Sequence, residues 1–245
     1  MAVRFTAESQ AFTGALNIGA QTIYSMCGWV KLSVDRNAFS APFGVDNNVA
    51  TNCTYFQTNS DGTSQRCLFD NSTATNMGAH TVNTWTFIAM SVNGNNVTAY
   101  QRILGAPSFT TYTSTPANTS VTMTTLRVGR FFATGEWWNG AVAGIRLWTG
   151  VALTATEWAA EFGSLSAVRR TNLAGEWLLT NNTTTADTSG NNRNLTGGTG
   201  STTEASPALT SSSPTVTVWN GTAEVTATIT VWNGTTEIAG TFTVN

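Results

Sequence analysis

Short apolar segments alternate with clusters of turn-forming residues along most of the chain. This spacing is typical of antiparallel sandwiches, in which short strands are joined by turns rich in Gly, Asn, Asp and Ser. Asn93 and Gly94 separate two alternating runs and predict a hairpin, because a type I′ turn requires positive φ at both central residues. We therefore expect strands over residues 23–32, 38–45, 54–58, 66–69, 84–92, 97–104, 126–132 and 140–148.

One segment has helical periodicity instead. Thr154 and Glu157 form the pattern of a capping box, in which Thr154 is the N-cap and Glu157 reaches back from the third helical position. Apolar residues follow at helical spacing: Trp158, Phe162 and Leu165. We expect a short helix here, packed against the end of the sandwich.

The C-terminal part differs from the rest in composition and contains a repeat. Residues 199–214 are rich in Gly, Ser, Thr and Pro, which predicts a linker. After it, the octapeptides 217–224 and 230–237 are nearly identical, and each predicts a strand, an Asn-Gly turn and a return strand. Isolated hairpins are marginally stable, so we expect the tail, 215–245, to contact its own sandwich, another copy or a larger assembly. The sandwich itself is expected over 1–198.

Composition and charge narrow the possible partners. Charged residues make up 10% of the chain, against about 25% in typical soluble domains, and Thr and Asn take their place. The net charge of −2 and the lack of a Lys/Arg run argue against nucleic acid and anionic membranes. No segment approaches the ~20 apolar residues of a membrane span, and the N-terminus does not resemble a secretory signal. We expect synthesis in a host cytoplasm without a cleaved leader.

Five segments resemble motifs of one known family. Residues 24–32, with Trp29, resemble a conserved strand of the laminin-G-like and pentraxin-like jelly rolls, and 85–100 resemble their central hairpin. Further motifs are similar to 126–129, 138–157 and 173–191. The resemblance implies an all-β, concanavalin A-like jelly-roll sandwich with one short helix, to which the repeated hairpin tail is added.

The resemblance implies a fold more firmly than a function. Members of the family bind glycans or proteins, some through Ca²⁺, and catalytic glycosidases share the architecture. A Lys-poor, Thr- and Asn-rich chain of this kind with a small repeated β tail also resembles virion proteins of tailed bacteriophages, which serve as capsid decorations, head fibres or tail-fibre components.

Candidate catalytic residues are few. Glycoside hydrolysis requires two carboxylates about 5–10 Å apart, and no expected strand carries such a pair on one face. Glu157 and Glu161 are spaced i, i+4 on the helix, where we expect Glu157 to cap and Glu161 to be solvated. His80 is the only histidine and cannot by itself build a zinc site or a triad; we expect it in a loop. The sequence therefore predicts no catalytic residue and no enzyme.

Metal binding and disulfide formation have equally limited support. The carboxylates to test first as Ca²⁺ ligands are Asp61, Asp70 and Asp187. Asp187, in Asp-Thr-Ser-Gly-Asn, more simply makes an Asx turn, so we expect no metal or other cofactor, with Ca²⁺ as the alternative. Cys53 and Cys67 flank a turn-rich segment and are either bonded or reduced. Cys27 is expected to be a small buried hydrophobe.

The segment 135–140 is the most suggestive candidate for ligand binding. Successive strand residues point to opposite faces, so Trp137 and Trp138 cannot both lie in the core. Trp138 matches the core aromatic position of the family. Trp137 is then a candidate for stacking on a sugar ring or a partner, unless it covers the helix or a loop. Glu136 and Phe132 complete the candidate ligand-binding set.

Trp219 and Trp232 occupy equivalent positions beside the two Asn-Gly turns of the tail. They either pack across their own strands or anchor the tail on a partner surface. We include them as candidate partner-binding residues.

The leading hypothesis is a non-enzymatic structural protein of a bacteriophage virion that displays a lectin-like sandwich. Its expected partners are other virion proteins, such as a capsid or tail protein, host-surface glycans and further copies of the chain in a symmetric oligomer. A free carbohydrate-binding module or lectin is the alternative, and a glycoside hydrolase is a weaker one.

Overall fold

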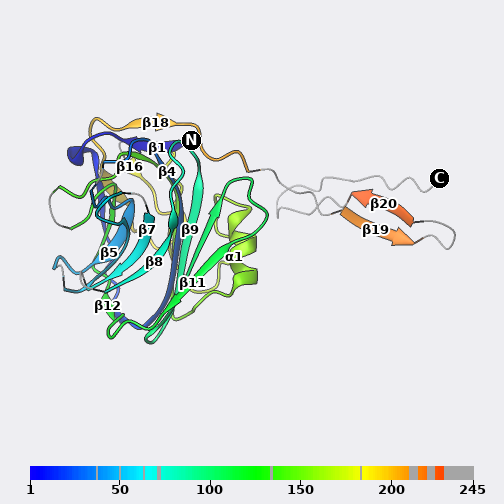
Figure 1. Ribbon diagram of the computed structural model, residues 1–245, viewed down its shortest axis with the longest axis horizontal. Coiled ribbons are helices and arrows are strands. Elements are labelled where there is room, and N and C mark those ends of the chain that lie inside the picture. The colour runs from blue at the N-terminus through cyan, green and yellow to red at the C-terminus, as the bar shows by residue number, and fades with distance from the viewer. Residues whose placement is uncertain are drawn as a thin grey trace. The chain divides into compact units, whose positions relative to one another are not determined.

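Figure 1 shows a computed structural model, which describes residues 1–36, 38–49, 51–62, 64–70, 73–132, 135–182, 184–209, 215–219 and 224–228. It divides into two units, Met1–Pro207 and Ala208–Asn245. The first unit is a sandwich of two antiparallel sheets. It extends past residue 198, because β18 (Thr202–Glu204) pairs with β1 (Ala2–Phe5). The predicted boundary at 198 is therefore too early, and the start of the predicted linker belongs to the sandwich.

The first sheet has the order β11-β10-β9-β4-β14-β1-β18, and β15 also pairs with β14. Its remaining members are β11 (Thr110–Ser114), β10 (Asn96–Ile103), β9 (Thr86–Asn93), β4 (Ile23–Leu32), β14 (Gly140–Thr149) and β15 (Leu173–Trp177). The predicted hairpin is confirmed: Asn93 pairs with Asn96 across the turn, and Gly94 has a φ of 58°.

The second sheet has the order β16-β17-β2-β13-β5-β6-β7-β8. These strands are β16 (Thr184–Thr185), β17 (Leu195–Gly197), β2 (Phe12–Ala15), β13 (Thr125–Val128), β5 (Phe43–Asp46), β6 (Cys53–Thr58), β7 (Ser64–Phe69) and β8 (Thr73–Ala79). Two of them are shorter than predicted. β5 begins only after Pro42, which has no N–H to donate, and β13 ends before Gly129, whose φ is 85°.

Three small elements complete the unit. A 3-10 turn, η1 (Glu8–Gln10), follows β1, and β3 (Ala20–Gln21) pairs with β12 (Val121–Thr122) in a two-stranded sheet. No helix in the described part of the chain is long and apolar enough to cross a membrane.

The core lies between the two sheets, and the longer strands contribute alternate residues to it. On β9, Ile88, Met90 and Val92 join this core, whereas Phe87 lies on the opposite face. Trp138 is fully buried, as predicted. No disulfide joins Cys53 to Cys67: Cys67 lies in the main core, and Cys53 belongs to a smaller cluster on the other side of the second sheet.

The predicted helix is confirmed as α1 (Ala155–Phe162), which is followed by Gly163. Thr154 accepts from the Glu157 backbone N–H, and Glu157 accepts from the Thr154 backbone N–H at 2.8 Å. α1 lies against the side of the first sheet that is turned away from the core (Figure 1). Trp158 is fully buried there, 5.7 Å from the ring of Trp148.

In the second unit, β19 (Thr215–Trp219) pairs with β20 (Glu224–Thr228) as an antiparallel hairpin. These are the two strands predicted for the first copy of the repeat, and its Asn-Gly turn lies outside the described residues. The second copy, with Trp232, lies outside the described residues.

Candidate functional site

The second sheet has a polar face on the side turned away from the core, which we call its outer face. Arg127 on β13 and Tyr55 on β6 belong to this face, and both lie beside Gly44 of β5. A Cβ atom on Gly44 would lie 2.2 Å from the Tyr55 ring, so only glycine lets the ring lie flat across the strand.

Asp46 anchors this polar face. It is fully buried, and its Oδ2 accepts from Arg127 Nε at 2.7 Å and from the Tyr55 hydroxyl. Arg127 Nη2 also donates to Asn48 Oδ1 at 2.7 Å. Burial and the charge of Asp46 raise the pKa of Tyr55, so its hydroxyl remains a donor. For Arg127, the hydrogen bond and charge of Asp46 outweigh burial and raise the pKa. The guanidinium is thus a fixed, charged group.

A shallow depression of about 340 Å³ lies beside Arg127. Its polar lining comes from three strands and two loops: Thr13, Asn48, Thr125, Arg127, Asn194 and Thr196. None of the residues that line it is a carboxylate. Hydroxyls and amides both donate and accept hydrogen bonds. The depression therefore suits a neutral polyhydroxylated ligand.

Phe132, a predicted ligand-binding residue, lies near this depression. It is partly buried against the small cluster formed by Ala41, Cys53, Tyr55, Leu68 and Phe131. The Arg127 guanidinium lies 5.2 Å from the centre of its ring. Phe132 therefore contacts a residue that lines the depression, although it does not line the depression itself.

Glu136, a second predicted residue, holds its loop onto the sheet. Its carboxylate accepts from Gln57 Nε2, and Gln57 Oε1 accepts from Arg66 Nε at 2.9 Å. Its main-chain carbonyl accepts from the Phe131 N–H at 3.0 Å. Burial raises the pKa of Glu136, although Gln57 and Arg66 act in the opposite direction.

Trp137 is partly exposed, and an arginine covers one face of its ring. The Arg36 guanidinium lies 4.1 Å from the ring centre, and its Nη1 donates to the Trp137 carbonyl at 2.9 Å. Trp137 does not line the depression. Its role in ligand binding stays a prediction, as does the role of Trp219, whose backbone ends β19.

The sequence made one prediction for each of the two carboxylates on α1. The prediction for Glu157 is confirmed, and the one for Glu161 is wrong. Glu157 caps α1 as predicted, and the N–H of Thr154 lowers its pKa. Glu161 is not solvated: it is 1% exposed and forms an ion pair of 2.5 Å with Arg146, which is 0% exposed. Glu161 Oε1 also accepts from the Arg169 N–H at 2.7 Å. The partner of Glu161 comes from strand β14, which sequence spacing along the helix does not reveal.

His80 follows β8 in a loop, as predicted. Its ring centre lies 5.7 Å from that of Trp138. Burial lowers the pKa of His80 to about 4, with Asp35 acting in the opposite direction, so the imidazole is neutral at pH 7. This is a packed side chain at one end of the core.

The three candidate Ca²⁺ ligands do not gather at one place. Asp61 precedes β7 and Asp70 follows it, so they lie at opposite ends of one strand. Asp187 makes the predicted Asx turn, accepting from the Ser189 N–H at 2.9 Å, and also accepts from the Glu176 and Arg193 N–H groups at 3.0 Å. No group of three or more His, Cys, Asp or Glu suited to a metal occurs among the described residues.

The lining residues of the depression were not predicted from the sequence. Thr13, Asn48, Thr125 and Thr196 are far apart in the chain, and sheet pairing brings them together. Arg127 alone carries a signal: it stands between apolar Leu126 and Val128 on a strand, so its side chain must point away from the core.

Neither a protein-family model nor a curated protein matches the sequence. Among solved structures, the enzymatically active domain of tailspike protein 2 from bacteriophage CBA120 is similar, with 11% identity over 72% of this chain and 29% of that chain, and a TM-score of 0.56. A heptameric pentraxin from Limulus polyphemus (14% identity, 63% and 77% coverage, TM-score 0.45) and the LG4-5 domains of mouse laminin α1 (9%, 63% and 44%, 0.44) are also similar.

The chain thus aligns with less than a third of the tailspike. At these identities the likeness concerns the fold. It confirms the jelly-roll sandwich that the sequence motifs predicted.

Proposed function

We propose that this chain is a non-enzymatic glycan-binding protein of a bacteriophage virion, and that it binds neutral sugar units in the depression beside Arg127. The observation that carries the proposal is the lining itself. Hydroxyl and amide groups surround a guanidinium that Asp46 holds in place. A side chain fixed before binding loses little conformational entropy when a ligand arrives.

The virion assignment has separate support. A phage tailspike shares the sandwich fold, and the repeated tail offers the same turn chemistry twice, which suits a symmetric partner or a homo-oligomer. A free lectin is the alternative. Electron microscopy of the source particle separates the two, because a virion protein occupies fixed, symmetric positions.

The non-enzymatic part of the proposal rests on how the nearby carboxylates are used. Asp46 is committed to Arg127 and Tyr55, and Glu136 accepts from Gln57. A general acid and a base or nucleophile both have to reach the glycosidic bond, and neither carboxylate lines the depression. Incubation with surface polysaccharides of the host should release no oligosaccharide. Product release that Asp46→Asn or Glu136→Gln abolishes would overturn this part.

The binding site is tested by a substitution that places a large side chain in the depression. Thr196 is exposed on β17 and lines the depression, and Thr196→Trp should lower glycan binding tenfold or more on an array of host polysaccharide fragments. Thr111→Trp is the matched control, since Thr111 is an exposed threonine on an edge strand of the other sheet. Equal binding by both variants would contradict the site.

The tail is tested by truncation after Pro207, where the first unit ends. We expect the shortened chain to stay folded and to bind glycans but to lose particle association. Loss of folding would instead assign the tail to the stability of the sandwich.

A further inference from the structure

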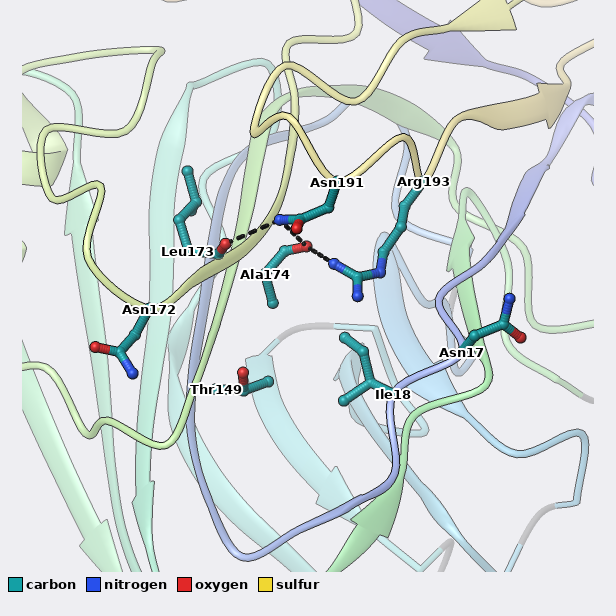
Figure 2. Close-up of a pocket in the computed structure, with 8 residues that line it drawn as sticks. All are labelled: Asn17, Ile18, Thr149, Asn172, Leu173, Ala174, Asn191 and Arg193. Carbon is teal, nitrogen blue, oxygen red and sulfur yellow. Dashed lines mark hydrogen bonds between the residues drawn. The ribbon is translucent and has the colours of Figure 1, made fainter.

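A second depression, of about 300 Å³, shares no residue with the first. It lies where the end of β14 and the start of β15 meet the segment that follows β2 (Figure 2). Arg193 lies on one side of it, and Ile18, Leu173 and Ala174 supply apolar surface. We call it the Arg193 pocket.

Arg193 is held at both its main chain and its side chain. Its N–H donates to Asp187 Oδ2 at 3.0 Å, and its carbonyl accepts from Trp177 Nε1 at 2.7 Å. The guanidinium donates through Nε to the Leu16 carbonyl at 2.6 Å and through Nη1 to the Ala174 carbonyl. Figure 2 shows the third guanidinium nitrogen directed toward Ile18, into the pocket.

The positive charge of Arg193 has no anionic partner among the described residues. The ion pairs found there involve Arg4, Lys31, Arg127, Arg146, Arg169 and Arg170. The acceptors of Arg193 are carbonyls without net charge. Asp187 is nearby, but its carboxylate accepts from three main-chain N–H groups. Burial raises the pKa of Asp187, but hydrogen bonds from the Ser189 side chain and from these N–H groups outweigh it and lower the pKa.

The rest of the pocket is lined by neutral residues, and among its asparagines Asn191 is held by hydrogen bonds. Asn17 and Asn172 have φ values of 51° and 66°, a left-handed conformation that asparagine tolerates. Asn191 uses its Nδ2 on the Leu173 and Ala174 carbonyls, at 3.1 and 3.2 Å, which leaves its Oδ1 as an acceptor. A sugar ring can contact this apolar surface and form hydrogen bonds with the amide groups. A planar carboxylate on the same sugar can accept hydrogen bonds from the guanidinium.

We infer that the Arg193 pocket binds the carboxylate of an acidic sugar, such as a hexuronate unit of a polysaccharide. Arg193 pairs with the carboxylate, Asn191 accepts from a ring hydroxyl, and Ile18 contacts the apolar face of the ring. This site is separate from the depression beside Arg127, so either can fail without the other.

The test is calorimetric titration of the full chain with a tetramer of galacturonate and with the matching neutral tetramer of galactose. The charged tetramer should bind at least about tenfold more tightly, because a charge-assisted hydrogen bond favours one partner by that order. Arg193→Gln should remove this preference. Since Arg193→Gln also loses the bonds to Leu16 and Ala174, a second variant is needed.

Thr149→Glu places a carboxylate in the pocket from the end of β14 without removing any contact of Arg193. It should weaken binding of the uronate tetramer at least about fivefold more than Thr149→Gln, which has the same shape without the charge. Thr111→Glu, which adds the same charge on β11, should leave binding unchanged.

Three results would overturn the inference. One is equal affinity for the charged and neutral tetramers, or no binding of either. Another is equal binding by Thr149→Glu and Thr149→Gln. The last is competition by inorganic phosphate or sulfate at the affinity of the uronate, which would make the pocket a general anion site rather than one for carboxylated sugars.

Discussion

The two sheets of the sandwich use their outer sides differently, although each carries an arginine paired with a buried carboxylate. On the first sheet, α1 covers an aromatic layer, with Phe162 4.8 Å from Trp29 and Trp158 6.3 Å from Phe87. The Arg146–Glu161 pair is sealed beneath this layer. The part of that side beneath α1 is closed to any ligand.

On the second sheet, the equivalent arginine lies at the edge of solvent. Arg127 is paired with buried Asp46, but it is 8% exposed and lines an open depression. An arginine–carboxylate pair is thus sealed inside the structure on one sheet, and on the other it holds a cation at the wall of the depression that we propose as a glycan site. Access by water, rather than residue type, separates the two roles.

The largest expected effect is at the sealed pair. Glu161→Gln leaves Arg146 charged and buried without a counter-charge, which typically costs about 3–5 kcal/mol of unfolding free energy. Urea denaturation measures it. The control is Glu157→Gln, at a carboxylate that is 30% exposed and pairs with Arg169, where about 1 kcal/mol is expected. Equal losses in the two variants would show that the first pair is not sealed.

A smaller loss is expected at the open pair. Asp46→Asn should cost roughly 1–3 kcal/mol, because Arg127 keeps Asn48 as an acceptor and can reach water. Asn48→Gly removes the other bond to the same guanidinium without straining a residue whose φ is 67°, and it should cost about 1 kcal/mol or less. A loss at Asp46 as large as that at Glu161 would erase the contrast between the two sheets.

Much of the fold was predictable because local signals determine it. The Asn-Gly hairpin, the capping box and the alternation around Trp138 each depend on neighbours in sequence. The end of the sandwich was misplaced because β18 is three polar residues long and has no apolar pattern. Only its pairing with β1 makes it a strand.

The candidate site was less predictable, since its residues meet through register. Thr13 lies opposite Arg127 on one side and Thr196 on the other, and no spacing in the sequence encodes those pairs. Glu161 was misjudged for the same reason: a helix pattern shows an exposed i, i+4 pair, but not the arginine that β14 supplies beneath it.

The smallest expected effects concern two carboxylates, Glu136 beside the second sheet and Glu157 on α1, and the two effects have opposite signs. Burial raises the pKa of Glu136 beside the second sheet, so its contribution to stability is present below the unfolded pKa and is lost as pH rises through the folded pKa. Glu136→Gln still accepts from Gln57. Its Tm should therefore match that of the parent near pH 4 and exceed it at pH 7, by no more than about 2 °C.

For Glu157 on α1 the pKa is lowered by the Thr154 N–H, and stability is lost as pH falls. Glu157→Gln should thus be less stable at pH 7 and approach the parent at low pH. Thermal scans at pH 4 to 7 compare the two. If Glu136→Gln is instead less stable than the parent at pH 7, the charge of Glu136 is needed for its interactions with Gln57 and Arg66. The outer face of the second sheet then carries an essential anion beside its arginine.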